Sequence, residues 1–369
     1  DAGERCWAMV GMRDVAKEAG VSLSTVSLVV NKTGYVSDDM RARVKAAMKE
    51  LNYVPNELAR NLYKNRTNLV GVIVPTIRHP FFATLTAHLQ RELAAQGLRT
   101  MLCSTADAEN GEVEYVDMLR RHMMDGIIVC SHTTHPNDYW TSIHRPIVAF
   151  DRVLGGGIAS IGSDHEQGGR LMAHMLVNTG AHHVVMIGGP RDQFFDLAAR
   201  NGDSPDDFDL HKTTFPAVRY YLTLEQELKA AGVRYEYVEA GNVEDFQGYK
   251  NAVNAVLNSM PVDGVDAVVS SDIGAALCVR EAMRRHISIP RDLQIIAYDG
   301  TYLTDLAGMK MTAVAQNFDK IAQVAVGNIV RAIAKEGDAK ADTTSATGRK
   351  PYEPDVLIPV TRKLGDTTR

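Results

Sequence analysis

The residues best suited to hold a small polar ligand stand where predicted strands end. Polar side chains occupy these positions, namely Thr76, Ser131, Asp151, Arg152, Asp272 and Asp299. Carboxylates and a guanidinium can form paired hydrogen bonds with adjacent hydroxyl groups. These residue types therefore suit a polyhydroxylated ligand, with an aromatic ring stacked on one of its faces. Each of them would equally serve as a cap of the helix that follows its strand.

A second chemistry is indicated near the N-terminus, by "GVSLSTVSLVVN". Ser22 suits the N-cap of a helix because its hydroxyl can accept a hydrogen bond from a free backbone N–H. Leu23, Ser24 and Thr25 follow it, where most surface helices carry charge. Their hydroxyl and methyl groups are small enough to contact base edges in the major groove of DNA. A small helical domain with no DNA role explains the same periodicity.

Three short helices must position this helix end. Apolar residues at helical spacing predict a first helix over 13–19, which ends at Gly20. Val26 begins the apolar face of a second helix, and Ser37 caps a third. Together they predict a helix-turn-helix unit.

The segment that follows the third helix is predicted to fold only in part. "LNYVPNELARNL" indicates a helix end, a turn and a very short helix that begins near Pro55. Such a helix is too short to be stable alone in water. Because Leu58, Ala59 and Leu62 form one apolar stripe, we expect it to order against a partner.

From Leu69 onward the pattern changes to alternating strands and helices. Repeated strand–helix order predicts doubly wound parallel sheets. The remaining length is enough for two such subdomains with a cleft between them. Ligands in these folds bind beyond the carboxyl ends of the strands, where the polar residues described above stand.

Charge is distributed unevenly along the chain. The 369 residues carry a net charge of −5, yet residues 1–66 contain 11 Lys or Arg and 8 Asp or Glu, a net charge of +3. A basic head on an acidic body indicates that only the head meets a polyanion. A solvated helical surface would explain so small an excess equally well.

The sequence contains no recognised catalytic or metal-binding pattern. HExxH, CxxC, GxSxG and P-loop motifs are absent, and the four cysteines are far apart. No apolar run is long enough to span a membrane, and residues 1–12 lack the features of a secretory signal. We therefore expect a cytoplasmic protein without catalytic residues, metal or cofactor, and with no membrane partner.

Two long motifs are similar to those of a known family. "DVAKEAGVSLSTVSLVVN" and "VSDDMRARVKAAMKELNYVPNELARNL" resemble the lactose-repressor (LacI/GalR) family of bacterial transcription regulators, and weaker motifs extend the likeness across nearly the whole chain. The resemblance implies an N-terminal all-α helix-turn-helix domain with a hinge helix. It also implies an α/β core like that of periplasmic binding proteins, with two doubly wound parallel-sheet subdomains.

The expected boundaries follow from this resemblance. They are a helix-turn-helix domain over 9–54, a hinge helix and linker over 55–67, and an effector-binding and dimerisation core over 68–369. Within the core we expect a first subdomain of about 68–163 and 300–323, and a second of about 164–299 and 324–362. Since the chain lacks the leucine heptads that make some members tetramers, we expect a homodimer.

The resemblance also implies which residues meet double-stranded operator DNA. Leu23, Ser24 and Leu28 correspond to the principal base readers, and Ser22, Thr25, Ser27 and Asn31 to residues that contact the backbone or adjacent bases. Leu62 corresponds to the hinge leucine that enters the minor groove, with Asn56 and Ala59 facing the same groove. Leu28 departs from the Arg or His of many members, and its side chain cannot donate a hydrogen bond to guanine.

The family's effector site is implied by four further motifs. "RHPFFATL" gives Phe82, with Phe81 second, as the ring that stacks on a sugar, and "AFDR" gives Asp151 and Arg152. "SSDIGAALCV" gives Asp272, and "IIAYDGT" gives Asp299; Ser131 completes the expected site. The effector arginine is either Arg200, which has the usual spacing, or Arg219, which begins a helix-like segment and which we favour. Residues 201–218 would then be an exposed insertion near the cleft mouth.

These likenesses predict a repressor of carbohydrate-utilisation genes that leaves a palindromic operator when a small sugar binds. "YDGT" resembles the branch of the family linked to sucrose and related oligosaccharides. A regulator that responds to a purine or a phosphorylated sugar, including as a co-repressor, is the alternative. A sugar-binding protein without a DNA role is more remote.

Overall fold

The computed structural model describes residues 10–55, 66–106, 110–133, 135–195, 213–242, 245–337 and 354–369. The chain divides into two compact units, Asp1–Thr67 and Asn68–Arg369. We refer to them as the head and the core, and describe each by itself.

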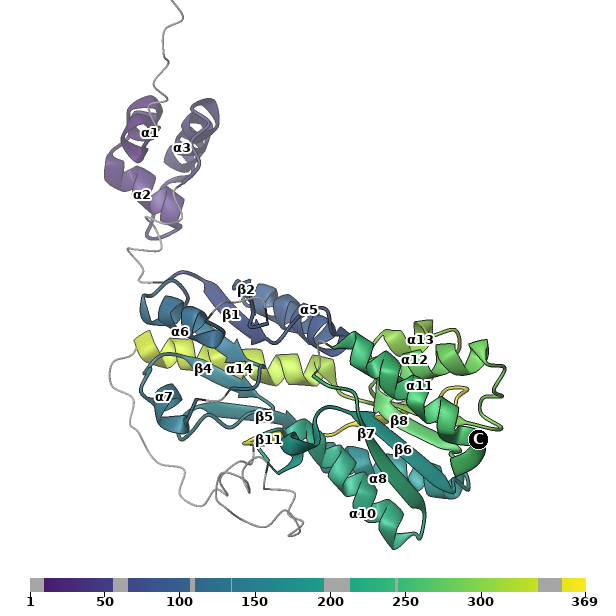
Figure 1. Ribbon diagram of the computed structural model, residues 1–369. Helices are drawn as coiled ribbons and strands as arrows, with labels where there is room; N and C mark the ends of the chain where they lie inside the picture. The colour runs from purple at the N-terminus through teal and green to yellow at the C-terminus, as the bar shows by residue number, and fades with distance from the viewer. Residues whose placement is uncertain are drawn as a thin grey trace, which may run out of the picture. The chain divides into compact units, whose positions relative to one another are not determined.

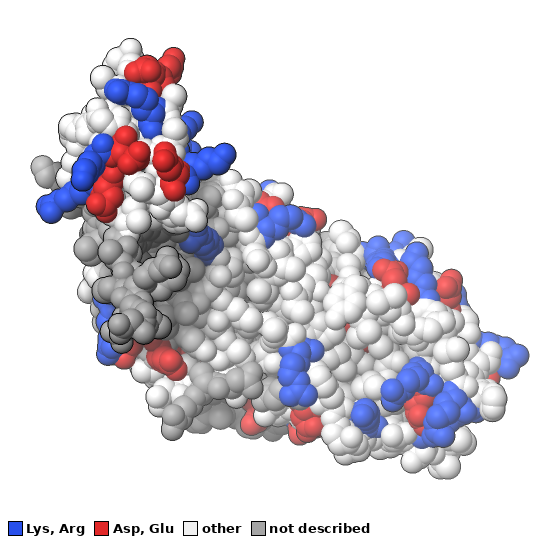
Figure 2. All heavy atoms as spheres, turned by 90° about the horizontal axis from the view of Figure 1, so that it is seen from above, with Lys and Arg blue, Asp and Glu red and all other residues white. Residues whose placement is uncertain are grey.

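The head contains three helices: α1 (Met12–Ala19), α2 (Leu23–Asn31) and α3 (Asp38–Glu50). Val15, Val26 and Val44, one from each helix, are fully buried where the helices meet. The predicted N-caps are confirmed, since the Ser22 and Ser37 hydroxyls accept from the backbone N–H groups of Thr25 and Met40. On the face seen in Figure 2, basic and acidic side chains of the head are interspersed.

The core has two lobes, each built on a six-stranded sheet (Figure 1). The first sheet is entirely parallel, in the order β11-β5-β4-β3-β1-β2. Its strands are β1 (Leu69–Val74), β2 (Arg99–Ser104), β3 (Gly126–Val129), β4 (Ile147–Phe150), β5 (Ala159–Ser163) and β11 (Val356–Ile358). Its helices are α5 (Pro80–Ala95), α6 (Glu112–Arg120), α7 (Asn137–Thr141) and α14 (Phe318–Gly337).

The second sheet has the order β12-β10-β9-β8-β6-β7, with β12 antiparallel to β10. Its strands are β6 (His183–Gly188), β7 (Arg234–Glu239), β8 (Ala267–Ser271), β9 (Gln294–Asp299), β10 (Thr312–Ala315) and β12 (Thr361–Lys363). Its helices are α8 (His165–Asn178), α10 (Arg219–Ala230), α11 (Phe246–Asp263), α12 (Asp272–Arg284) and α13 (Leu303–Leu306), with 3-10 turns η1 (Arg191–Phe194) and η2 (Pro216–Val218).

The chain passes between the lobes at places that differ from the expected division. Residues 300–323 were expected in the first subdomain, yet β10 pairs with β9 in the second sheet. Residues 324–362 were expected in the second subdomain, yet most of α14 packs on α5 and the first sheet, and β11 pairs with β5. The expectation was wrong because alternation of strands and helices does not specify which sheet an element joins. The apolar face of α14, with Ile321 and Ile329, belongs to the core around α5.

Candidate functional site

The exposed end of α2 carries a cluster of hydroxyl groups. The Ser22 Oγ lies 2.7 Å from the Ser24 Oγ and 2.8 Å from the Thr25 Oγ1, and it accepts from the Thr25 N–H at 3.1 Å. Leu23 beside them is 44% exposed, and Ser24 is exposed as well. The end of the helix therefore presents small polar groups and one aliphatic side chain, without charge, as the sequence predicts.

The rest of α2 is less accessible. Ser27, Leu28 and Asn31 are half-buried, and the Asn31 side-chain amide donates to the Ser27 Oγ at 3.1 Å. Leu28 packs partly against the head's apolar core and lies close to Gly34. The predicted hinge contacts Asn56, Ala59 and Leu62 lie outside the described residues.

Tyr35 is a candidate contact that the sequence analysis missed. It is 93% exposed and follows α2, in the loop that leads to Ser37. The sequence could have indicated it, because an aromatic residue stands in a polar turn, "NKTGYVS", where a buried role does not explain its presence. Tyrosine hydroxyls are among the groups that contact DNA phosphates.

A cleft lies between the two lobes of the core. The first lobe contributes Phe81, Phe82, Phe150, Asp151 and Arg152, and the second contributes Gln193, Tyr220, Tyr221, Tyr298 and Asp299, with Gln316 where the chain returns to the first lobe. The cleft thus brings together four of the predicted effector residues, Phe82, Asp151, Arg152 and Asp299.

Aromatic rings form much of the cleft wall. Tyr220 stacks on Tyr298 with ring centroids 3.8 Å apart, and lies 3.9 Å from Tyr221. Phe82 meets Phe81 edge to face at 5.0 Å on the opposite lobe. Burial raises the pKa of Tyr220, Tyr221 and Tyr298 well above the usual value. These hydroxyls are therefore neutral at physiological pH, and Phe82 is the half-buried ring that can stack on a sugar.

Buried hydrogen bonds connect the two lobes behind this wall. The Asp151 Oδ2 lies 3.0 Å from His165 Nε2, and His165 Nδ1 lies 2.7 Å from the Tyr298 hydroxyl. In the tautomer with its proton on Nε2, the imidazole donates to the Asp151 carboxyl oxygen and accepts from the Tyr298 hydroxyl at Nδ1. His165 therefore holds one carboxylate oxygen of Asp151 in place.

A second connection runs through Gln316. Its amide donates to the Asp299 Oδ1 at 2.8 Å, and its carbonyl accepts from the Ser163 hydroxyl at 2.5 Å. The Ser163 N–H in turn donates to the Asp151 Oδ1 at 3.2 Å. The two cleft carboxyls thus belong to one network, so a ligand that moves either of them acts on both lobes.

Asp299 is held in an unusual electrostatic state. Its burial, and then the neighbouring Asp272, raise its pKa well above the usual range. Asp299 also has a left-handed backbone, with φ of 110°, which a side chain rarely adopts without support. A carboxyl that holds its proton can donate as well as accept a hydrogen bond, which suits the hydroxyls of a sugar.

Two predicted effector residues support the cleft rather than line it. The Asp272 carboxylate accepts from the N–H groups of Gly300 and Thr301, at 3.1 and 2.6 Å, and so orders the turn after Asp299. Its burial raises its pKa to about 6. Ser131 is buried, and its backbone carbonyl accepts from the Arg152 Nε at 3.1 Å. Both residues therefore lie behind side chains that face the ligand space.

Arg219 does not face the cleft. It is buried on the other side of α10, near Ser163, Glu166 and Leu357. Arg219 and Tyr220 are neighbours on α10 and point about 100° apart, and of the two it is Tyr220 that lines the cleft. Tyr220 takes that direction because its ring stacks on Tyr298. The alternative, Arg200, lies outside the described residues.

Comparisons with known proteins identify the family of the head and of the core. Residues 11–56 match the model "Bacterial regulatory proteins, lacI family", residues 67–202 match "Periplasmic binding proteins and sugar binding domain of LacI family", and residues 173–350 match "Periplasmic binding protein-like domain". The chain is 33% identical to the sucrose operon repressor of Streptococcus mutans, over 87% of this chain and 92% of that protein. The chain belongs to the LacI family.

Another relative and a solved structure are also similar to this LacI-family regulator. It is 33% identical to the ribose operon repressor of Bacillus subtilis, over 79% of this chain and 82% of that protein. The solved lac repressor dimer bound to operator and the anti-inducer ONPF has a TM-score of 0.75 and 21% identity, covering 97% of this chain and 98% of that one. The predicted fold class, a helix-turn-helix head on a two-lobed α/β core, is confirmed.

The family assigns the chemistry of the two units. The head of a LacI-family regulator binds DNA, and the core carries a sugar-binding type of domain. Among the described residues, no three His, Cys, Asp or Glu side chains are placed to hold a metal ion. No helix in the described part of the chain is long and apolar enough to cross a membrane.

Proposed function

We propose that this regulator is a homodimeric repressor of carbohydrate-utilisation genes, and that it leaves a palindromic operator when a neutral sugar enters the cleft. The observation that carries the proposal is the composition of the cleft wall. The half-buried ring of Phe82 and the largely buried tyrosines form apolar surface, while Asp151, Asp299 and Arg152 offer hydrogen bonds at its polar edge. The relatives named above repress sucrose and ribose operons, which agrees with this chemistry.

Charge favours a neutral sugar over a phosphorylated one. Among the described residues that line the cleft, two are carboxylic acids and one is an arginine. The Arg152 guanidinium already donates to the backbone carbonyls of Ser131 and Asp151. A phosphate group would meet a site poor in cationic donors, whereas phosphate recognition usually relies on several of them.

The connection between cleft and DNA is expected to run through the lobes. Asp151 belongs to the first lobe and Tyr298 to the second, so a ligand bound between them favours one relative arrangement of the lobes. In a dimer, that arrangement would set the spacing of the two heads and their hinge segments. A sugar that favours the wider spacing lowers operator affinity.

Binding of both partners to one preparation tests the proposal. Calorimetric titration of the full chain with glucose, fructose, ribose, sucrose and cellobiose should reveal a ligand, and replacement of Asp299 by Ala should abolish its binding. DNA affinity of the Asp299→Ala variant should persist and no longer respond to the sugar. Failure of every neutral sugar, together with tight binding of a sugar phosphate or a purine, would replace the proposed ligand class.

A further inference from the structure

A second cavity adjoins the cleft, and Arg152 lines both. Its volume is about 210 Å³, compared with about 150 Å³ for the cleft itself. One wall is formed by the segment from the end of β3 to the first residue of α7, including His132 and Asn137. The other is formed by Thr213, Thr214 and Pro216, at the described end of the insertion expected over 201–218.

Residues 213–216 are anchored to the lobes rather than exposed. Thr213 is fully buried, and its hydroxyl donates to the Gln193 backbone carbonyl at 2.5 Å. The Phe215 N–H donates to the same hydroxyl at 2.9 Å. The expectation of an exposed loop over the insertion is therefore wrong for this part, which forms a built wall next to the cleft.

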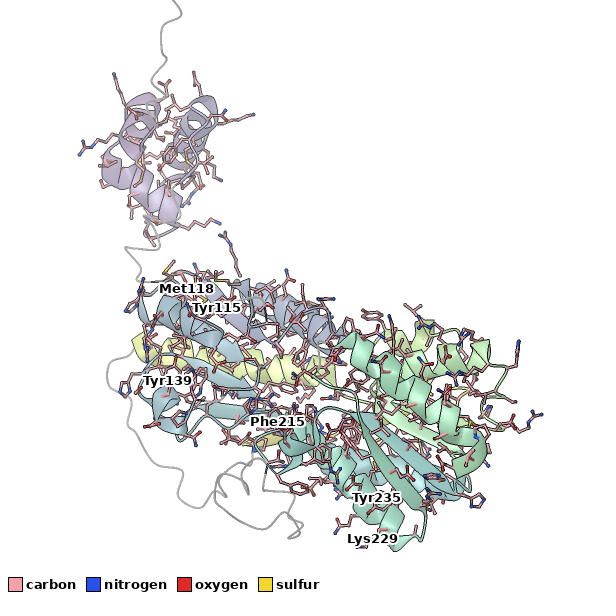
Figure 3. The ribbon with its side chains drawn as sticks, in the orientation of Figure 1. Tyr115, Met118, Tyr139, Phe215, Lys229 and Tyr235 are labelled. Atoms are coloured by element: carbon pink, nitrogen blue, oxygen red, sulfur yellow. The ribbon has the colours of Figure 1, made fainter. Side chains whose placement is uncertain are left out.

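A stacked pair joins the two sides of the cavity. The His132 and Phe215 rings lie 3.7 Å apart and within 7° of parallel, and the His132 Nε2 lies 3.2 Å from the Thr214 Oγ1. The Arg152 guanidinium lies 5.8 Å from the centre of the Phe215 ring. Figure 3 shows Phe215 where the first and second lobes meet. The pair connects the segment after β3 with the segment before α10.

The lining has the mixed character that a sugar ring requires. Asn137, His135 and Thr214 offer hydrogen-bonding groups, while Leu154 and Pro216 offer apolar surface. The His135 Nε2 lies 3.8 Å from the Glu112 Oε1, so this basic group of the lining has a carboxylate beside it. The cavity is therefore suited to a neutral polar ligand more than to an anion.

We propose that this cavity is a second sugar subsite, and that the regulator's effector is a disaccharide with one ring in the cleft and the other between His132 and Asn137. Arg152, which lines both spaces, lies beside the linkage between the rings and can donate to it. Neither space alone reaches the usual size of a small-molecule site, about 300 Å³ or more, whereas the two together do. This inference rests on the proposed function, since it names the ligand class of the same cleft.

Calorimetry with sucrose, cellobiose, glucose and fructose tests the subsite. We expect at least one disaccharide to bind about tenfold or more tightly than its component monosaccharides. Thr214→Tyr, at a half-buried position on the wall, should fill the cavity and remove this difference while leaving monosaccharide affinity unchanged. Asn137→Ala should weaken the disaccharide by about two- to tenfold, as loss of one hydrogen bond does. Asp138→Ala, at the exposed neighbouring position of α7, is the matched control and should change neither affinity.

The possible failures are distinguishable. If monosaccharides bind as tightly as disaccharides, or if Thr214→Tyr weakens both classes equally, the second subsite is wrong and the sugar cleft stands. If none of the four sugars binds the wild-type chain while the chain still binds DNA, the sugar-responsive function fails and the subsite fails with it. Circular dichroism of each variant shows whether a lost affinity reflects lost folding.

Discussion

Replacing Tyr298 by Phe tests the buried connection between the lobes most sharply. The substitution removes one hydroxyl, which contacts His165 Nδ1 at 2.7 Å, and keeps the ring that stacks on Tyr220 at 3.8 Å. The packing therefore changes little. His165 is only 2% exposed, so its Nδ1 would lose its donor in a place that water hardly reaches.

The magnitude follows from that burial. Leaving a buried polar atom without its partner costs about 1–3 kcal/mol. We expect the free energy of unfolding to fall by this amount in urea titrations of the full chain. Sugar affinity should fall by about two- to tenfold, because His165 no longer fixes the Asp151 carboxylate that faces the cleft.

Tyr235→Phe supplies the control. Tyr235 lies on the edge strand β7, outside the network and outside the cleft (Figure 3). Its loss of a hydroxyl should change the free energy of unfolding by less than about 0.5 kcal/mol and leave sugar affinity intact. If Tyr298→Phe proves as harmless as Tyr235→Phe in both measurements, the His165 connection does not position Asp151.

Three further predictions concern the head, the hinge and pH. Leu23→Ala with Ser24→Ala should weaken specific operator binding by at least about 5- to 150-fold, which corresponds to about 1–3 kcal/mol for a single base contact, and should leave sugar affinity unchanged. An equal loss of nonspecific DNA binding in filter assays would contradict base reading. Leu62→Ala should likewise weaken operator binding without changing sugar affinity, and parallel loss of both would exclude a hinge role. The pKa of Asp272 is raised from 3.8 to about 6 in the folded chain. The folded protein therefore binds this proton more strongly than the unfolded chain does, and the stabilisation that results is lost as pH rises from about 4 to 6. The loss of stabilisation over this pH range amounts to about 3 kcal/mol. Asp272→Asn should therefore flatten the slope of unfolding free energy against pH between about 4 and 6. An unchanged slope would assign the titration to other groups.

Much of the head and of both sheets could be predicted from the sequence, because the signals are local. The N-caps Ser22 and Ser37 are confirmed, and buried strands such as β6 and β9 stand out as apolar runs. Strand β5 was missed because "ASIGS" is small and polar, although most of it is buried. Its burial depends on its place in the sheet between β4 and β11, and β11 is far away in the chain.

The cleft was only partly predictable for a related reason. Strand ends identified Asp151, Arg152 and Asp299, since parallel strands bring their carboxyl ends to one edge. Arg219, favoured over Arg200 in the sequence analysis, does not line the cleft, whereas the next residue, Tyr220, does, because a one-residue step on α10 turns the side chain by about 100°. The aromatic wall of Tyr220, Tyr221 and Tyr298 had no sequence signal, because tyrosines in helices and strands are commonly core residues.

The most direct test of the central claim is the operator affinity of one preparation with and without sugar. A palindromic duplex selected from a random library would be titrated at fixed salt, because DNA affinity depends strongly on salt, and its binding followed by fluorescence anisotropy. At a sugar concentration about a hundred times the calorimetric Kd, we predict that the Kd for this duplex rises by about 5- to 150-fold, the usual range for coupled sites. An unchanged Kd at saturating sugar would show that the cleft does not control the head.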